Sequence, residues 1–386
     1  MKILDISHYY VDPPRSGGQL RIFNLNKEIG KKHIVTQFSF TPALIFRKKN
    51  KHNNYTEYIN IDPFYFISSF ILARIFRVPY DFPVDYLFRF KKASKKLKSA
   101  IKEVDIIQVE HPWVFSWIQK NAKGKPIVLV EHNFEYELQK EGYKKLPKLL
   151  QNLIFKSIKR IEQNAVIKAD LIFATSDTDK KNLEKFYNTS DKIKVIENGV
   201  DTSFSPSLNR NQIKKKFGFE NKKIILFTGA GHPPNYKAIK IIKEKIAPAF
   251  KEGIFLIAGS VHKKGREKNL FYTGSVEDIK SYFDMADVAI NPMLSGSGTN
   301  LKMLEYLSFG LPVITTKVGA RGFSLKNNKD SIICNIEDFS KNIKKILRNK
   351  YLYAKLKKNG KIFVKNFDWQ IIAEKAIENY NLLLRK

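Results

Sequence analysis

Short apolar segments rich in β-branched residues alternate along the whole chain with longer amphipathic segments, and this alternation restricts the possible folds more than any other feature. In the first half, the strand-like segments lie at residues 2–7, 33–40, 105–109, 126–130 and 170–174. In the second half, they lie at residues 223–228, 254–258, 270–272, 288–290 and 313–315. Strands that alternate with helices predict an α/β architecture, in which helices cover both faces of a parallel sheet.

The chain has 386 residues, which is long for one hydrophobic core, so we expect two domains. Each half has its own strands and helices and therefore predicts a separate doubly wound unit. Helices are expected at about residues 19–30, 237–250, 276–285, 300–309, 336–348 and 369–384. The polar stretch 198–218, which contains Pro206 and a lysine run, is the expected boundary between the two units.

The formal net charge of +32 leaves three explanations open. The excess of lysine is either a compositional bias without functional meaning, or it attracts an anionic membrane surface, or it attracts nucleic acid without sequence preference. No Cys/His zinc spacing and no aromatic RNA-binding signature accompany the charge. We therefore predict no specific nucleic-acid partner.

One region fits the membrane-surface interpretation. Residues 64–86 are dense in aromatic side chains, and Phe90, Ala93, Leu97 and Ile101 then recur at helical spacing. The opposite face of this expected helix carries Lys91, Lys92, Lys95, Lys96 and Lys98. A basic amphipathic helix beside aromatic residues can lie on a membrane interface. The alternative is a domain helix whose apolar stripe packs on the core and whose lysines are solvated.

Several features bear on the cellular compartment. Asp5 interrupts the short apolar start of the chain, which is therefore not expected to be a signal peptide. The most apolar stretch, residues 64–76, contains Arg74 and is shorter than the ~20 residues of a membrane span. Cys334 is the single cysteine, which fits a reducing compartment, and we expect an inert buried thiol there. We expect a cytoplasmic protein, and peripheral attachment to the inner face of the cell membrane stays open.

The strongest chemical signal lies between a predicted strand and a predicted helix. Ser295-Gly-Ser-Gly298 forms a glycine-rich turn there, and glycines together with a helix N-terminus favour a bound phosphate. Lys302 opposes the helix dipole, which makes better sense if it faces a diphosphate. Glu305, one turn later, is suited to accept hydrogen bonds from the hydroxyls of a ribose. The alternative is an ordinary helix that follows a glycine-containing loop.

These motifs resemble those of the retaining glycosyltransferases of family 4. The most specific piece is Leu301-Lys-Met-Leu-Glu305 followed by Gly310-Leu-Pro-Val313, and the stretch 195–204 is similar to the interdomain segment of the family. The resemblance implies the GT-B architecture, two facing Rossmann-like doubly wound parallel-sheet domains with a cleft between them. Residues 1–200 with 369–386 would form the acceptor-binding domain, and residues 201–368 the nucleotide-sugar-binding domain.

The resemblance also implies roles for individual residues. Glu305 matches the second glutamate of the family's E-x7-E motif, and Ser297 stands where the first would be. The family has an arginine and a lysine after the first strand of this domain. Here Ala230 or Gly231 fills the arginine position, and Lys302 is the expected substitute, with Lys237 as a weaker one. The predicted donor-binding residues are Gly17, Gly18, Gly229, Val276, Ser297, Gly298, Thr299, Asn300, Leu301, Lys302 and Glu305.

The first half contributes further candidates. Ser16-Gly17-Gly18 opens a long helix, and Arg15 and Arg21 could add positive charge beside it. His111 and His132 each follow a predicted strand, at the strand ends where α/β folds place ligands. An imidazole there can hold a sugar hydroxyl or relay a proton, whereas a lone loop histidine more often has no function.

The predicted site therefore combines both halves of the chain. We expect His132, Lys302 and Glu305 to be catalytic, and His111 and Arg21 to bind the acceptor. Asp177-Thr-Asp179 is expected to cap a helix, and we predict neither a metal nor a cofactor.

The expected partners are a nucleotide sugar and a sugar or lipid-linked acceptor, and the expected reaction is front-face transfer with retention. Two alternatives stay open. One is a nucleotide-sugar epimerase of the same architecture. The other is a non-catalytic protein that binds nucleotide sugars or polyanions.

Overall fold

The computed structural model describes residues 1–41, 49–61, 63–71, 83–89, 91–144, 146–189, 191–203, 210–276, 279–296 and 298–385. The chain divides into two compact units: a first unit of Met1–Asn198 with Trp369–Lys386, and a second unit of Gly199–Asp368. This division lies two residues before the expected boundary after residue 200.

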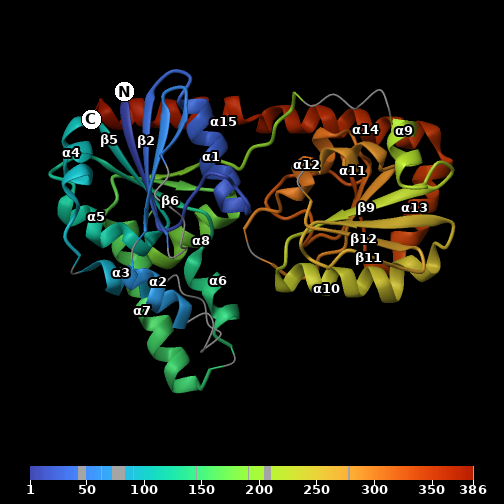
Figure 1. Ribbon diagram of the computed structural model, residues 1–386, viewed down its shortest axis with the longest axis horizontal. Helices are drawn as coiled ribbons and strands as arrows, with labels where there is room; N and C mark the ends of the chain where they lie inside the picture. Colours follow the sequence, from blue (N-terminus) through green and yellow to red (C-terminus); the bar gives the residue numbers. More distant parts are fainter. Residues whose placement is uncertain are drawn as a thin grey trace. The chain divides into compact units, whose positions relative to one another are not determined.

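A sheet forms the centre of the first unit (Figure 1). Among the described residues it has eight strands in the order β3-β4-β2-β1-β5-β6-β7-β8. They are β1 (Lys2–Ser7), β2 (Ile34–Thr41), β3 (Lys49–His52), β4 (Tyr55–Ile61), β5 (Ile106–Glu110), β6 (Ile127–Glu131), β7 (Leu171–Ala174) and β8 (Ile193–Val195). Neighbouring strands are parallel, apart from the antiparallel β3–β4 pair at one edge. Every residue of β5 and β6 is buried, as expected for strands covered on both faces.

Helices cover both faces of this sheet. They are α1 (Gly17–Ile29), α2 (Pro63–Phe70), α3 (Pro83–Arg89), α4 (Lys95–Glu103), α5 (Phe115–Asn121), α6 (Glu135–Gly142), α7 (Lys148–Lys168), α8 (Asp177–Tyr187) and α15 (Trp369–Leu384), with a 3-10 turn at Pro112–Val114. On one face, α1 and the final helix α15 share a core that contains Leu25, Ile372 and Tyr380. On the other face, α5, α7 and α8 enclose a larger core.

The second unit repeats this plan. Among the described residues its sheet has seven strands in the order β11-β12-β10-β9-β13-β14-β15. They are β9 (Lys223–Thr228), β10 (Gly253–Ala258), β11 (Gly265–Glu267), β12 (Leu270–Gly274), β13 (Val288–Asn291), β14 (Val313–Thr315) and β15 (Ile332–Ile333). Only β11 pairs antiparallel within this set. The prediction of two Rossmann-like parallel-sheet domains is confirmed.

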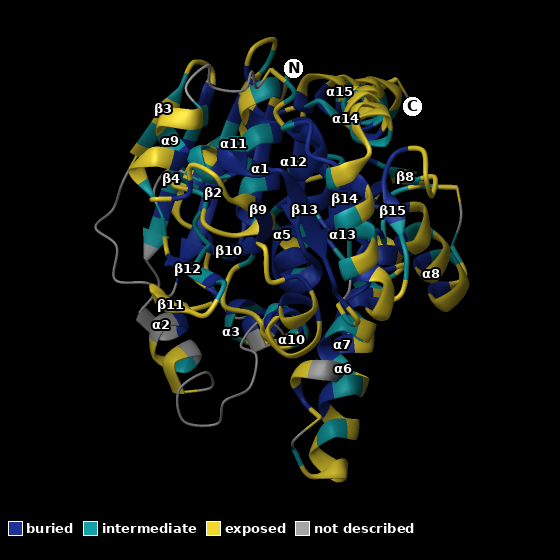
Figure 2. Cartoon of the chain, turned by 90° about the vertical axis from the view of Figure 1, so that its right-hand side faces the viewer, coloured by how far each residue is buried: buried dark blue, intermediate teal, exposed yellow. Residues whose placement is uncertain are grey.

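The helices of the second unit also lie on both faces of its sheet, over two separate core clusters. They are α9 (Arg210–Lys216), α10 (Pro233–Ile241), α11 (Lys280–Met285), α12 (Lys302–Ser308), α13 (Phe339–Arg348) and α14 (Lys350–Val364). Shorter turns are the π-helix Ile242–Ile246 and the 3-10 turns Ala247–Ala249, Ile336–Asp338 and Lys365–Phe367. Figure 2 shows that the central strands are buried, whereas the edge strands β3 and β11 and the outer faces of the helices are exposed.

Helix α4 decides between the two interpretations of the basic amphipathic segment. Leu97 and Ile101 are both 1% exposed and belong to the main core of the first unit, so the apolar stripe packs inside the domain. Lys95 and Lys96 are exposed. Phe90 lies outside the described residues. The packing supports the second interpretation, a domain helix whose apolar stripe lies on the core.

Two smaller predictions concern Cys334 and the Asp177–Asp179 pair. Cys334 is half-buried, and burial raises the pKa of its thiol to about 11, which keeps it protonated and unreactive. Ser176 caps α8 by accepting a hydrogen bond from the backbone N–H of Asp179 at 3.1 Å, and it donates its hydroxyl to the Asp179 carboxylate at 2.6 Å. Ser176 is therefore the cap, and Asp177 and Asp179 lie in the first turn of α8, where a carboxylate is favourable.

No helix within the described part of the chain is both long and apolar enough to cross a bilayer.

Candidate active site

The glycine-rich loop of the second unit runs from the end of β13 to the start of α12. Gly296 has φ +130° and Gly298 has φ +60°, backbone conformations that side chains with a Cβ rarely adopt. A Cβ on Gly296 would lie 2.6 Å from Nη2 of Arg321, whose Nε donates to the carbonyl of Gly298 at 3.1 Å. Arg321, which sequence reasoning missed, therefore places a cation directly against this loop. Ser297 lies outside the described residues.

Lys302 is the first residue of α12, and its side chain reaches the loop after β9. Its Nζ donates to the carbonyl of Thr228 at 2.7 Å and to Oδ1 of Asn235 at 2.9 Å, and it lies 4.2 Å from the ring centre of Phe227. From the resemblance to the family, we expected cations in the loop after β9. Lys302 reaches this loop from α12 and so places a cation there. Burial lowers its pKa to about 7, although Glu305 acts in the opposite direction.

Glu305 lies one turn after Lys302 on the same helix. Burial raises the pKa of its carboxyl group, and the charge of Lys302 lowers it. The structure gives this carboxylate no hydrogen-bond partner among the described residues. Around it, Leu304 and Leu307 are fully buried, and Tyr306 accepts the backbone N–H of Thr228 at 2.7 Å. The helix is thus held firmly while one carboxylate remains able to accept ligand hydroxyls.

The other predicted donor residues of the second unit fall into two groups. Gly229 and Thr299 occupy tight backbone positions, Gly229 against Asn235 and Thr299 against Gly322. Asn300 is buried and donates to the carbonyl of Gly319 at 3.1 Å, so its side chain holds the loop in place.

Leu301, which directly precedes α12, and Val276, in the segment after β12, are half-buried. Lys237, the weaker candidate cation, is exposed on α10. Within this unit, the structure brings together Gly229, Lys302 and Glu305.

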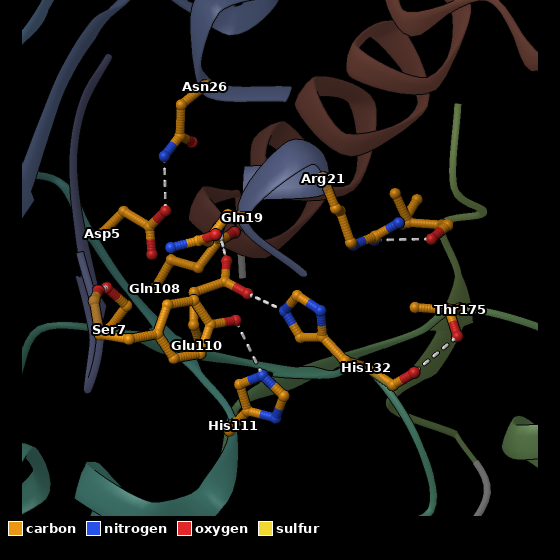
Figure 3. A network of polar contacts seen from close by, with 12 residues as sticks. Asp5, Ser7, Gln19, Arg21, Asn26, Gln108, Glu110, His111, His132 and Thr175 are labelled. Atoms are coloured by element: carbon orange, nitrogen blue, oxygen red, sulfur yellow. Dashed lines mark hydrogen bonds and ion pairs between the residues drawn. The ribbon is translucent and has the colours of Figure 1, made fainter. Parts of the chain in front are cut away.

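In the first unit, two histidines form the centre of a polar network (Figure 3). His132 Nε2 and Glu110 Oε2 are joined by a hydrogen bond, and His111 Nδ1 lies 2.9 Å from Glu135 Oε1. The two imidazole rings stack at 4.2 Å with an interplanar angle of 12°. Tyr9 Oη lies 3.1 Å from His111 Nε2. Each imidazole is therefore oriented by a buried carboxylate, an arrangement common where histidine acts as an acid or base.

Gly17 and Gly18 begin α1 beside these histidines. Ser16 caps the helix by accepting a hydrogen bond from the backbone of Gln19. A Cβ on Gly18 would lie 2.7 Å from Tyr9 Oη and 3.7 Å from His132 Nδ1. Gly18 therefore packs closely on Tyr9 and on the Nδ1 side of His132, opposite the nitrogen that contacts Glu110.

Burial dominates the charge states of this network. It lowers the pKa of His132 well below the ordinary range, and His111, Arg21 and His8 add to this effect. It raises the pKa of Glu110, where Asp5 acts in the same direction and Arg21 against it. The Glu110–His132 pair therefore favours a state without net charge, in which His132 is a neutral imidazole.

The prediction that Arg21 binds an acceptor needs correction. Arg21 is 1% exposed, and its guanidinium donates to the carbonyls of Glu197 and Ile196 at 2.7 Å and to Asn198 Oδ1 at 3.0 Å. Its side chain is thus committed to the segment after β8. We assign it a structural role, because a buried cation without these acceptors would be strongly disfavoured.

Sequence reasoning also missed the carboxylates of the network, although the sequence held a signal for them. Glu110-His111 and Glu131-His132 repeat the same pair at the ends of β5 and β6. Glu110 is hydrogen-bonded to His132 from the neighbouring strand end and not to His111, which follows it in sequence. Glu131 is fully buried, and neither of its carboxylate oxygens has a hydrogen-bond partner within the described residues. Burial and the nearby Glu162 raise its pKa well above the usual range.

Two family models match the chain. The one described as "Glycosyltransferase Family 4" matches residues 48–204, and the one described as "Glycosyl transferases group 1" matches residues 222–349. The two matches fall largely in the first and second unit, respectively.

Individual proteins give the same picture. The putative glycosyltransferase YtcC of Bacillus subtilis is 24% identical over 289 residues, which cover 67% of each chain. The Escherichia coli UDP-Gal:alpha-D-GlcNAc-diphosphoundecaprenol alpha-1,3-galactosyltransferase is 28% identical over 186 residues, 43% of this chain and 47% of the other. The structure of Anabaena HepE in complex with UDP-glucose matches with a TM-score of 0.70 at 16% identity, over 99% of this chain and 100% of the other. The structural neighbours confirm the predicted GT-B fold class.

Proposed function

Because the chain belongs to the group 1 glycosyltransferases of family 4, we propose that it transfers a sugar from a nucleoside-diphosphate sugar to an acceptor hydroxyl with retention of configuration. The observation that supports a nucleotide-sugar donor best is the pairing of Lys302 with Glu305 on α12. Glu305 offers an acceptor for ribose hydroxyls, and Lys302 offers a cation for the diphosphate.

The donor end of the reaction uses charge stabilisation. The bond between the anomeric carbon and the diphosphate oxygen breaks, and the diphosphate leaves with its electron pair. Lys302 and Arg321 are the cations near the glycine-rich loop that would stabilise this charge. A phosphate beside Lys302 favours the protonated lysine, so binding of the diphosphate would raise the pKa that burial lowers. With two protein cations in this position, we propose that transfer needs no bound metal ion.

The acceptor end of the reaction is proposed for the first unit. The acceptor oxygen forms the new bond to the anomeric carbon, and its proton passes to the leaving phosphate oxygen, so atoms and charge balance without a protein nucleophile. His132 would hold the acceptor hydroxyl through Nδ1, the ring nitrogen nearest Gly18. His111, which Glu135 and Tyr9 orient, would hold a second hydroxyl.

For the acceptor class, we propose a sugar attached to a lipid. The name of the Escherichia coli relative describes an enzyme that acts on a sugar linked to diphosphoundecaprenol. A lipid-linked acceptor would also give a reason for attachment to the inner face of the cell membrane. The region around Ser297 would contact the transferred sugar and decide its identity. For the sugar we propose a hexose and name no particular one.

A ligand-binding measurement on Glu305→Gln tests the donor site. Uridine diphosphate should raise the melting temperature of the unaltered protein, since a ligand that binds only the native state stabilises it. Glu305→Gln should lose most of this shift while keeping its own melting temperature. Glu337→Gln, whose side chain is 74% exposed, is the matched control and should behave like the unaltered protein. An unchanged shift in Glu305→Gln would refute the proposed ribose contact.

Turnover separates the remaining alternatives. Release of nucleoside diphosphate that depends on an added acceptor supports transfer. A changed sugar without any acceptor would indicate an epimerase, and binding without turnover of any nucleotide sugar would indicate a non-catalytic protein.

A further inference from the structure

Helix α7 carries exposed leucines at its N-terminal end. Leu149 is 76% exposed, Leu150 44% and Leu153 60%, although leucine is normally among the most buried residue types. Figures 1 and 2 both show that α6 and the first turns of α7 extend away from the sheet at the lower end of the first unit. We call residues 148–153 the α7 tip.

The position of these leucines on the helix explains why the domain core does not cover them. Ile154, Ile158 and Ile161 recur at helical spacing and form the stripe by which α7 packs on the core. Leu150 continues this stripe beyond the end of the core. Leu149 and Leu153 lie to one side of it, four residues apart and therefore on one face. The tip thus presents apolar side chains that the core of the unit leaves largely exposed.

Basic residues surround these leucines. Residues 138–160 contain seven lysines and arginines and a single acidic residue, Glu141. Five of these basic residues are exposed beside the tip or on the following turns: Lys144, Lys148, Lys156, Lys159 and Arg160. Farther back on α6, Glu137 is paired with Lys140 at 2.8 Å. Exposed leucines within a basic rim match the anionic headgroups and acyl boundary of a membrane. Lysine is depleted in protein interfaces, which speaks against a protein partner.

A second group of exposed apolar residues lies on α2, toward the same lower end of the first unit in both views (Figures 1 and 2). Ile67 is 57% exposed and Phe70 54%. Helix α3 links the two groups, because its Tyr86 is hydrogen-bonded to Ser157 of α7, and Arg89 lies 5.0 Å from the Tyr86 ring. Exposed apolar and aromatic residues therefore recur from α2 through α3 to α7.

We propose that the α7 tip inserts its leucines into the surface of an anionic lipid bilayer, with its basic rim on the headgroups. This surface differs from the α4 stripe that the sequence suggested, and it goes beyond the proposed transfer reaction. Binding to lipid through the tip requires no nucleotide sugar, so its success or failure is independent of the proposed activity.

Co-sedimentation with vesicles tests the proposal. The full chain should bind vesicles that contain about a third phosphatidylglycerol and bind pure phosphatidylcholine vesicles at least tenfold more weakly. The double variant Leu149→Ser/Leu153→Ser should weaken binding to the anionic vesicles by roughly tenfold or more. Its control is Leu382→Ser/Leu384→Ser, at 50% and 43% exposed positions near the end of α15, which should bind normally.

A charge-matched pair separates the basic rim from the total charge of +32. Lys144→Glu/Lys148→Glu should weaken binding to anionic vesicles, whereas Lys345→Glu/Lys350→Glu in the second unit, which changes the net charge equally, should have little effect. Equal losses in both variants would attribute binding to overall charge and overturn the proposal. Unchanged binding of Leu149→Ser/Leu153→Ser, or equal binding to neutral vesicles, would also overturn it.

Two further readouts complete the test. Circular dichroism and the melting shift with uridine diphosphate should be the same in the leucine variant and the unaltered chain, which excludes misfolding and separates this proposal from the proposed function. If the unaltered chain ignores vesicles but forms dimers that Leu149→Ser/Leu153→Ser abolishes, the tip binds a second copy of the chain and the membrane proposal is wrong.

Discussion

Replacement of Lys302 by methionine tests the proposed diphosphate contact most directly. An ammonium group about 4 Å from one phosphate charge gains about 4 kcal/mol at an effective dielectric constant near 20. To reach the phosphate, Nζ must give up its hydrogen bonds to Thr228 and Asn235, at about 1 kcal/mol each. The net loss in Lys302→Met is then about 2 kcal/mol, or about 30-fold weaker binding of uridine diphosphate.

The pH dependence of binding makes this prediction specific to a lysine with a lowered pKa. In the free protein the pKa of Lys302 is about 7, and a bound diphosphate requires the protonated form. The diphosphate itself is already ionised above pH 7, because the phosphate pKa is about 6. A proton taken up on binding above pH 7 should therefore reside on Lys302. Deprotonation cannot cost more than loss of the ammonium group itself, so we expect uptake of about 0.7 proton at pH 8 and a roughly 10- to 20-fold weaker affinity at pH 9 than at pH 7.

Isothermal titration calorimetry in buffers of different ionisation enthalpy measures both quantities. Lys302→Met should show weak binding and little proton uptake, and its affinity should be almost independent of pH. Lys237→Met, on exposed α10, is the control and should resemble the unaltered protein. An unaltered protein that takes up no proton, or a Lys302→Met variant with full affinity, would refute the reasoning.

The remaining predictions concern geometry. Glu110→Gln should keep the fold and the uridine diphosphate shift but lower kcat by roughly 10- to 100-fold, because the amide orients His132 but lacks the charge of a carboxylate. If the double variant Glu110→Gln/His132→Ala is no slower than His132→Ala alone, Glu110 and His132 act as one unit. Gly296→Ala should lower the free energy of unfolding by about 1–3 kcal/mol in urea, since its Cβ meets Arg321 at φ +130°. Gly124→Ala, at φ +78° in open space, should lose less, and equal losses would remove Arg321 from the explanation.

The central strands of both sheets were predictable because a parallel strand covered on both faces must be continuously apolar. Edge strands escape this rule. Strand β3 has the sequence KNKH and β11 the sequence GRE, and both pair antiparallel at an edge where solvent reaches them. Polar composition at an edge resembles that of a loop, so only their register with β4 and β12 defines them as strands.

The polar network of the first unit was only partly predictable. His111 and His132 were found because they follow strands, and the position of a ligand site at strand ends is a property of the fold. Their partners Glu110 and Glu135 were not found, because glutamate is almost never fully buried unless it is paired. The side of each strand that faces the neighbouring histidine depends on register, which a single sequence does not define.

The glycines were predicted for one reason, and the structure gives them another. Gly296 and Gly18 were taken as positions where backbone amides approach a phosphate. In the structure, each lies against a functional side chain, Gly296 against Arg321 and Gly18 against Tyr9 and His132. A Cβ at Gly296 would lie 2.6 Å from Arg321 at φ +130°, and a Cβ at Gly18 would lie 2.7 Å from Tyr9 Oη, so packing favours glycine at both positions with or without a phosphate. The case for a nucleotide-sugar site therefore does not depend on the glycines. The case for this site depends on the Lys302 and Glu305 pair and on the side chains that pack against the glycines, Arg321 and His132.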